Sequence, residues 1–258
     1  MLTYDPAPSV TGLGDKASIG AHLEGGTRQL AALRDALAVA LVLNRTLVVP
    51  QLKCFCDKVW GGHDNIFNFN CHYPGSADTG HMPGPCPLDH FISPSKLRAA
   101  GVRFVAAAEL EHAPYRRAVS GRGTVDVIVT DAATAAAAAA VEGTIGTIGV
   151  PSGADEATLV RLLGAGAAGG APLLRLSTAV PGTFGGFNSP ELGVWFNRRV
   201  VTALEPPEWC SECHPQGCKN LIPAEVIAKG RLLPVRGVHD QFCAAFQTPA
   251  PAPLVSAQ

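Results

Sequence analysis

The sequence predicts an α/β fold, a Rossmann-like and mostly parallel sheet flanked by helices, with a long Cys-rich loop excursion. Leucines at positions 30, 33, 37 and 41 recur at helical spacing, and a short β-branched run at 46–49 follows them. The same alternation of helix-like and strand-like segments recurs later in the chain. Helices that alternate with short apolar strands are typical of parallel sheets.

The first part of the chain divides into an extended segment and the start of the domain. Residues 1–26 contain several prolines and glycines and are predicted to be extended. A single α/β domain is predicted over residues 27–247. Its first helix spans 27–43 and ends at Asn44, and the strand at 46–49 ends at Pro50.

Residues 51–93 are predicted to form the long loop excursion, because they show little periodicity. Loops longer than ~15 residues in compact domains are usually functional or disordered. Aromatic residues argue against disorder here. They are Trp60, Phe67, Phe69 and Phe91.

The second half of the chain returns to alternating strands and helices. Strands are predicted at 102–105, 125–129, 144–150 and 173–176. Helices are predicted at 106–112, over the alanine run that starts at Asp131, at 154–163, and at 189–204 with Ser189 as its cap. Residues 164–170 are interpreted as a flexible link, and the Pro/Ala-rich tail 248–258 as disordered.

Charge and hydropathy exclude two classes of partner. The 258 residues carry a net charge of −1 and no clustered basic face, which argues against nucleic-acid binding. No run of about 20 apolar residues exists, so no membrane span is expected. The N-terminal residues MLTYDPAPSV show neither a signal peptide nor an anchor.

Eight cysteines in loop-like contexts favour structural disulfides and an oxidising compartment. The sequence alone does not define how they pair. A zinc site formed by Cys210, Cys213, His214 and Cys218 in the Cys-rich segment 209–218 is the alternative. The disulfide candidates are Cys54, Cys56, Cys71, Cys86, Cys210, Cys213, Cys218 and Cys243.

The segment PCPLDHF contains adjacent acidic and basic side chains that are candidates for catalysis. Asp89 precedes His90, and a carboxylate can orient an imidazole for proton transfer. The alternative is that both residues cap a turn after proline.

The segment HLEGGTRQL contains a candidate anion site. Gly25 and Gly26 precede the predicted helix, whose free N–H groups could hold a diphosphate. Arg34 lies at the edge of the apolar stripe, where an arginine either snorkels to solvent or meets a buried acid or a phosphate. A structural ion pair is the alternative for Arg34. Arg28 and Asp35 are placed on the opposite side of this helix.

The acidic residues do not predict a metal site. Metal-dependent sugar-nucleotide transferases hold Mn²⁺ or Mg²⁺ on an Asp-x-Asp motif after a strand, and the chain has no such motif. Asp126 and Asp131 flank one predicted strand but are too far apart to act as that motif. Asp131 is interpreted as a helix cap.

Three segments together resemble a known family. They are RQLAALRDALAVALVLNRTLVVPQLKCFCDKVW, PCPLDHF and FNRRVVTALEPPEWCSECH. In this order they are similar to the C-terminal half of plant and algal nucleotide-diphospho-sugar transferases of glycosyltransferase family 77, which include arabinosyltransferases. The opening helix and strand also resemble those of protein O-fucosyltransferases. The likeness is best over residues 20–100 and looser over 170–215.

The resemblance implies an enzyme of the Golgi lumen or secretory pathway that transfers a sugar from a nucleotide donor to a cell-wall glycoprotein or polysaccharide. Gly25, Gly26 and Arg34 would then face the donor diphosphate, and Asp89 and His90 the acceptor hydroxyl. A divalent cation, Mn²⁺ or Mg²⁺, is expected only if an upstream domain supplies the Asp-x-Asp, so the chain is interpreted as a truncated or accessory half.

Two other functions are compatible with the same residues. One is a non-catalytic domain with a degenerate transferase fold that binds a glycan or a protein. The other is a zinc-stapled interaction module.

Overall fold

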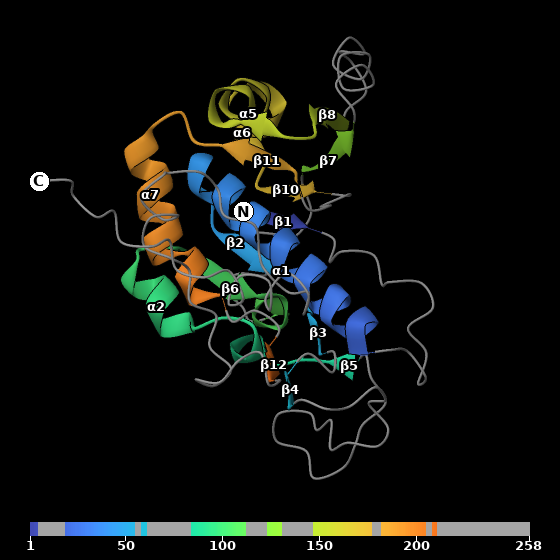
Figure 1. The fold of residues 1–258 in the computed structure, drawn as a ribbon. Coiled ribbons are helices and arrows are strands. Elements are labelled where there is room, and N and C mark those ends of the chain that lie inside the picture. The colour runs from blue at the N-terminus through green and yellow to red at the C-terminus, as the bar shows by residue number, and fades with distance from the viewer. Residues whose placement is uncertain are drawn as a thin grey trace, which may run out of the picture.

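The computed structural model describes residues 1–4, 19–54, 58–60, 84–111, 123–130, 147–176, 182–204 and 208–210, with the backbone alone at 19–24, 58–60, 111 and 208–210. Its centre is a six-stranded sheet in which every neighbouring pair is parallel, and this confirms the predicted α/β class (Figure 1). In spatial order the strands are β6 (Phe104–Ala106), β2 (Leu47–Val49), β1 (Leu2–Tyr4), β10 (Leu173–Leu176), β7 (Thr124–Thr130) and β8 (Thr147–Pro151).

Strand β1 lies in the middle of the sheet, between β2 and β10. Leu2 pairs with Leu47 on one side and with Leu174 on the other. Residues 2–4 are extended, as predicted, but they belong to the sheet instead of preceding the domain. Three residues are too few to show an alternating pattern, and the two strands that bury β1 lie far away in the sequence.

Helix α1 (Ile19–Val42) begins well before the predicted start at residue 27. It ends before Asn44, whose φ of 52° is a left-handed conformation that asparagine tolerates, as predicted. Every residue from 29 to 40 is buried, because α1 packs against β1, β2, β11 (Phe184–Gly186) and α5 (Glu156–Leu163). Asp35 is thus buried, although it lies on the side of the helix opposite the leucine stripe.

Arg45 ties the turn after α1 to the amino end of the sheet. Its guanidinium donates to the carbonyl oxygens of Met1, Ala168 and Ala171 at 3.2, 2.7 and 2.7 Å. Ala168 belongs to the short helix α6 (Gly166–Gly170), in a segment predicted to be a flexible link. That prediction was wrong for 166–170, since the arginine satisfies carbonyl groups at the end of this helix.

Two helices of the second half begin at side-chain caps, of which the one at Ser189 was predicted and the one at Asp155 was not. Asp155 precedes α5, and its carboxylate accepts the N–H of Thr158 at 2.9 Å. Ser189 precedes α7 (Pro190–Arg199), and its hydroxyl accepts the N–H of Leu192 at 3.1 Å. The remaining elements here are η3 (Ala107–Glu111), β9 (Ala154–Asp155), which pairs with β11, and η4 (Val201–Ala203). The alanine run from Asp131 and the tail 248–258 lie outside the described residues.

The predicted loop excursion contains short ordered elements. Strands β3 (Lys53–Cys54) and β5 (Gly84–Pro85) pair antiparallel, and η2 (Leu88–His90) follows them. Helix α2 (Pro94–Ala99), which was not predicted, comes next. Strand β4 (Lys58–Trp60) pairs with β12 (Glu208–Cys210), so the two Cys-rich segments meet in the fold.

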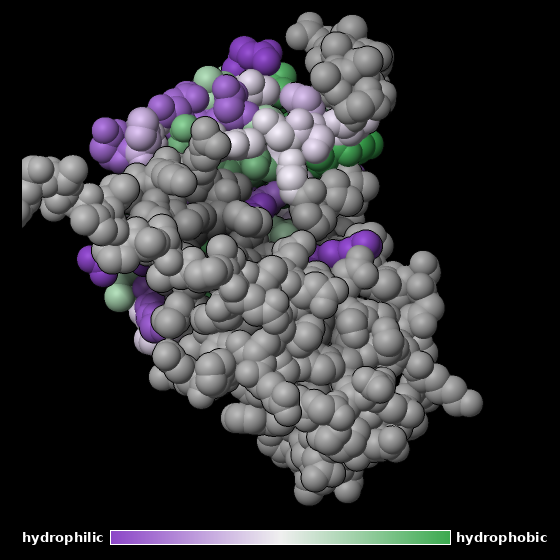
Figure 2. Space-filling model, viewed as in Figure 1, coloured by the Kyte–Doolittle hydropathy of each residue, from purple (hydrophilic) through white to green (hydrophobic). Residues whose placement is uncertain are grey.

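The surface differs between regions of the sheet. In β7, Val125, Val127 and Val129 are buried, whereas Ile128 on the other face is 42% exposed. Figure 2 shows that described residues on the viewed side are mostly hydrophilic or neutral over α5 and α7, with a small hydrophobic area beside β7 and β8. Within the described ranges, no helix is both long and apolar enough to cross a membrane.

Candidate functional site

The order of the strands defines a switch point between β1 and β10. The chain leaves β1 towards β2 on one side of the sheet, whereas β7 and β8 lie on the other side, beyond β10. Ligands of open α/β sheets bind outside the carboxyl ends of the strands at such a point. Tyr4 and Leu176 are the last residues of the two strands there.

Tyr4 places a buried hydroxyl at the end of β1. The residue is 2% exposed, and within the described residues its hydroxyl has no hydrogen-bond partner. Burial raises the pKa of this phenol far above its usual range, so the group stays protonated. A buried polar atom without a partner is uncommon in proteins and can indicate a ligand contact.

Helix α1, which follows β1 in the chain, contains a buried ion pair. The Arg34 guanidinium donates from Nε and Nη2 to Oδ1 of Asp35 at 2.8 and 2.6 Å. Arg34 is 7% exposed and Asp35 is 1% exposed. Of the alternatives considered for Arg34, the structure contains the structural ion pair with a buried acid.

Asp35 also joins the two segments that leave the switch point. Its Oδ2 accepts the backbone N–H groups of Gly182 and Phe184 at 2.8 and 3.4 Å. Gly182 follows β10 and has a φ of 98°, a conformation that favours glycine. Its carbonyl accepts the N–H of Gly153 at 2.7 Å. One carboxylate therefore fixes α1, which follows β1, to the segment that follows β10.

The anion site predicted at Gly25 and Gly26 rests on a wrong helix boundary. Both residues lie within α1, which begins at Ile19, and both are buried. Amide groups inside a helix donate to carbonyl groups four residues earlier and are not available to a diphosphate. A contact between these glycines and a sugar donor stays a prediction. Free N–H groups at a helix N-terminus no longer support it, because both glycines lie inside α1.

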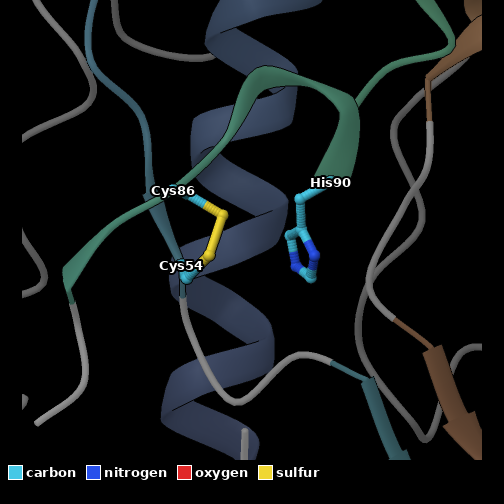
Figure 3. Close-up of side chains that lie close together, drawn as sticks. All are labelled: Cys54, Cys86 and His90. Atoms are coloured by element: carbon cyan, nitrogen blue, oxygen red, sulfur yellow. A yellow bond between two sulfur atoms is a disulfide. The ribbon is translucent and has the colours of Figure 1, made fainter. Parts of the chain in front are cut away.

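The predicted pair Asp89 and His90 lies on η2. Asp89 is exposed, and the half-buried His90 ring contacts Phe91 edge-on at 4.7 Å between centroids. The disulfide prediction is confirmed for Cys54 and Cys86, which are bonded to each other. Figure 3 shows the His90 ring beside this disulfide, and the three potential ligand atoms lie within 4.8 Å of one another. The catalytic role of Asp89 and His90 stays a prediction.

The other cysteine predictions are outside the part of the chain with described side chains. Cys210 is described only by its backbone in β12. Cys56, Cys71, Cys213, Cys218 and Cys243 lie outside the described residues, as does His214 of the alternative zinc site.

Asp126, one of the two aspartates considered around β7, lies within the described residues and forms an ion pair. Asp126 accepts from Arg175 on the neighbouring strand at 2.7 and 3.0 Å, in a partly exposed ion pair. Asp131 lies outside the described residues.

Three residues near the site were not identified as functional from the sequence. Tyr4 and Asp35 owe their burial to contacts with distant segments. Gln29 holds both backbone groups of Lys53, donating at 3.1 Å and accepting at 2.8 Å. A polar residue within the long apolar stretch of α1 was the available signal for Gln29 and Asp35, because such residues need buried partners.

Comparison with known proteins gives one partial similarity. The chain is 38% identical over 90 residues to Arabinosyltransferase XEG113 of Arabidopsis thaliana. The match covers 34% of this chain and 13% of that protein, so the chain spans a small part of its relative. No family model matches the chain, and no solved structure matches it significantly. The similarity supports a glycosyltransferase-like relation in coarse terms.

Proposed function

We propose that the chain is part of a nucleotide-sugar-dependent glycosyltransferase. The observation that carries the proposal is the 38% identity to an arabinosyltransferase over 90 residues. The parallel sheet supports it, because sheets of this type commonly bind nucleotides at a switch point. Within the proposal, the enzyme belongs to family 77, acts in the Golgi lumen and transfers sugar to a cell-wall glycoprotein or polysaccharide.

The donor would bind outside the carboxyl ends of β1 and β10. There the Tyr4 hydroxyl would donate a hydrogen bond to a polar group of the donor, which gives a buried donor group the partner that it lacks among the described residues. Arg34 and Asp35 would act mainly by holding α1 and the segment 182–184 in place around the donor. A site whose segments are already held in place loses less conformational entropy when a ligand binds.

The acceptor would bind on the side of η2. Asp89 is exposed there, and a carboxylate can accept the proton of an attacking hydroxyl. His90 lies next to it in the sequence and would serve as the alternative base. A Mn²⁺ or Mg²⁺ ion would neutralise the donor diphosphate only if an upstream Asp-x-Asp domain were present.

The proposal is tested by calorimetry with UDP-sugars and GDP-fucose on the folded, disulfide-containing protein, with and without Mn²⁺. We expect saturable binding that Tyr4→Phe weakens about 5–10-fold, which corresponds to roughly 1–1.5 kcal/mol for one hydrogen bond. Asp126→Asn, on the other face of the sheet, is the matched control and should bind as the parent does. Absence of binding to the folded parent protein would refute the proposal.

A second candidate is a non-catalytic domain that binds a glycan or a protein. The absence of an Asp-x-Asp from the sequence favours it. A glycan array that gives specific binding, together with no heat of binding for any nucleotide sugar, would support this candidate. Transfer activity that Asp89→Asn or His90→Gln abolishes would exclude it.

A further inference from the structure

The Cys54–Cys86 disulfide and His90 form a compact group that the proposed transfer reaction does not require. We propose that, once this disulfide is reduced, Cys54, Cys86 and His90 bind one thiophilic divalent cation of the Zn²⁺ class. The two sulfur atoms and a ring nitrogen of His90 already lie within 4.8 Å of one another (Figure 3). Two thiolates and one imidazole are a set of ligands that zinc prefers.

The two cysteines remain adjacent without the bond between their sulfur atoms. The N–H of Cys86 donates to the carbonyl of Leu52 at 2.9 Å, and its carbonyl accepts from Gln51 at 2.8 Å. Cys54 pairs with Gly84 in the β3–β5 ladder. None of these hydrogen bonds involves sulfur, so reduction leaves the backbone positions of both thiols defined.

Helix α1 also holds β3 in place, through the side chain of Gln29. The buried Gln29 side chain donates to the carbonyl of Lys53 and accepts its N–H, and Lys53 directly precedes Cys54. A side-chain amide that satisfies both backbone groups of one residue holds that residue in a single orientation. The position of Cys54 therefore depends on α1 as well as on β5.

His90 is positioned independently of the disulfide. The backbone N–H of His90 donates to the Pro87 carbonyl at 3.2 Å, and the next two residues, Phe91 and Ile92, are buried. The N–H of Ser93 donates to the carbonyl of Ala203 at 2.7 Å, which anchors the end of this segment. The imidazole thus stays beside the sulfur atoms when the disulfide opens.

Distance and charge both suit a metal ion. Zn–S bonds of ~2.3 Å and Zn–N bonds of ~2.0–2.1 Å in a tetrahedron place ligand atoms roughly 3.5–3.8 Å apart, so shifts of about 1 Å complete the site. Two thiolates and a neutral imidazole cancel the charge of Zn²⁺, which lowers the cost of burying the ion beside Cys54 and Cys86. The half-buried His90 leaves a path from solvent.

The chemistry requires a reductant, which would be a low-molecular-weight thiol. Two thiol molecules reduce the S–S bond through a mixed disulfide, yield the two cysteine thiols, and leave as their own disulfide. Metal binding then releases the two thiol protons. The disulfide and the metal are therefore mutually exclusive states of the same three residues.

The test is a Co²⁺ titration of the full chain under anaerobic conditions, with Co²⁺ as a spectroscopic substitute for Zn²⁺. The protein is first treated with a phosphine reductant, and mass spectrometry after an acid quench checks that Cys54 and Cys86 are reduced while circular dichroism remains native. We expect thiolate-to-Co²⁺ charge-transfer absorption and tetrahedral d–d bands, which Zn²⁺ abolishes by competition.

Variants separate this site from the other six cysteines of the chain. Loss of a residue that only hydrogen-bonds to a metal ligand typically lowers metal affinity ~10–100-fold. We expect His90→Gln, which removes a ligand, to lower the affinity of the tightest Co²⁺ site by at least this factor. The double variant Cys54→Ser/Cys86→Ser should remove that site. Asp89→Asn changes the neighbouring residue and should bind Co²⁺ as the parent does. His90→Gln keeps the disulfide, so its oxidised form reports whether the variant folds.

Three results would overturn the proposal. The first is a disulfide that resists reduction while the chain stays folded, and the second is a reduced chain that loses its fold. The third is a Co²⁺ spectrum and affinity that His90→Gln leaves unchanged. Failure of nucleotide-sugar binding would not bear on this site, because the metal titration is measured without any donor.

Discussion

Two similar ion pairs, one on helix α1 and one on the sheet, lie in very different surroundings. On α1, Arg34 and Asp35 are almost completely buried, and Asp35 also accepts two backbone N–H groups. On the sheet, Arg175 and Asp126 link β10 to β7 while Arg175 remains 50% exposed. The Arg34–Asp35 pair therefore connects distant segments of the fold, whereas the Arg175–Asp126 pair connects only two neighbouring strands.

Burial and additional partners, rather than the ion pair itself, therefore decide the role of a charge. Exposed pairs contribute little because solvent and salt screen them. A buried carboxylate that loses its partners is strongly unfavourable, and this dependence makes it specify one arrangement. Asp35 uses this dependence to hold together two segments that are 147 residues apart in the sequence.

The largest effect that we expect comes from Asp35→Ala. The change removes the carboxylate that Arg34 contacts and the acceptor of two backbone N–H groups, and should lower the free energy of unfolding by about 3–5 kcal/mol. Urea unfolding followed by circular dichroism measures it. A loss no greater than that of Asp126→Ala would show that the contrast between the two ion pairs has no energetic basis.

Neighbouring residues of β7 provide the next comparison. Val127→Ala removes buried methyl groups and should reduce the free energy of unfolding by about 2–3 kcal/mol. Ile128→Ala affects a residue that is 42% exposed and should change it by less than about 1 kcal/mol. Equal losses of unfolding free energy for the two variants in urea would contradict the assignment of one buried and one exposed face to this strand.

Alkaline pH gives a third, smaller contrast. Burial raises the pKa of Tyr4 above its ordinary value of 10.0, so above that pH the unfolded chain releases a proton that the folded chain keeps. The contribution of Tyr4 is complete below pH 10 and decreases by about 1.4 kcal/mol per pH unit above it. Tyr4→Phe should lack this decrease. Unfolding curves of both proteins on each side of pH 10 measure the difference, and parallel pH profiles would refute it.

The smallest effect is expected for Asp126→Asn. The exposed pair with Arg175 should contribute about 0–1 kcal/mol, and the contribution should decrease further in 1 M salt. Thermal unfolding at low and high salt measures both values. A loss above 2 kcal/mol that salt does not change would mean that this face is less accessible to solvent than its exposed residues indicate.

Sequence patterns predicted the parts of the fold that depend on local periodicity. Strand β10 and the Ser189 cap of α7 lie where the pattern placed them, since alternation and capping are local properties. Strand β1 was missed because its burial depends on β2 and β10. The start of α1 was misplaced because Gly25 and Gly26 resemble a helix boundary and are nevertheless inside the helix.

The candidate site was predictable only as a set of residue types. The sequence identified Cys54, Cys86 and His90 but could not pair them, because their contacts depend on the strand pair β3–β5 and on η2. It also identified Arg34 but not its partner, which is the next residue, Asp35. The burial of Asp35 was not predicted, because it lies opposite the leucine stripe and α1 is buried on that side as well.

The pairing of β1 with β10 affects how the sheet can form during translation. Leu2 leaves the ribosome before its partner Leu174, which lies 172 residues later in the sequence. At roughly 5–20 residues per second, the backbone groups on that side of β1 wait on the order of 10–30 s for their neighbour. During that interval this side of β1 is an unpaired strand edge, of the kind that can pair with another chain.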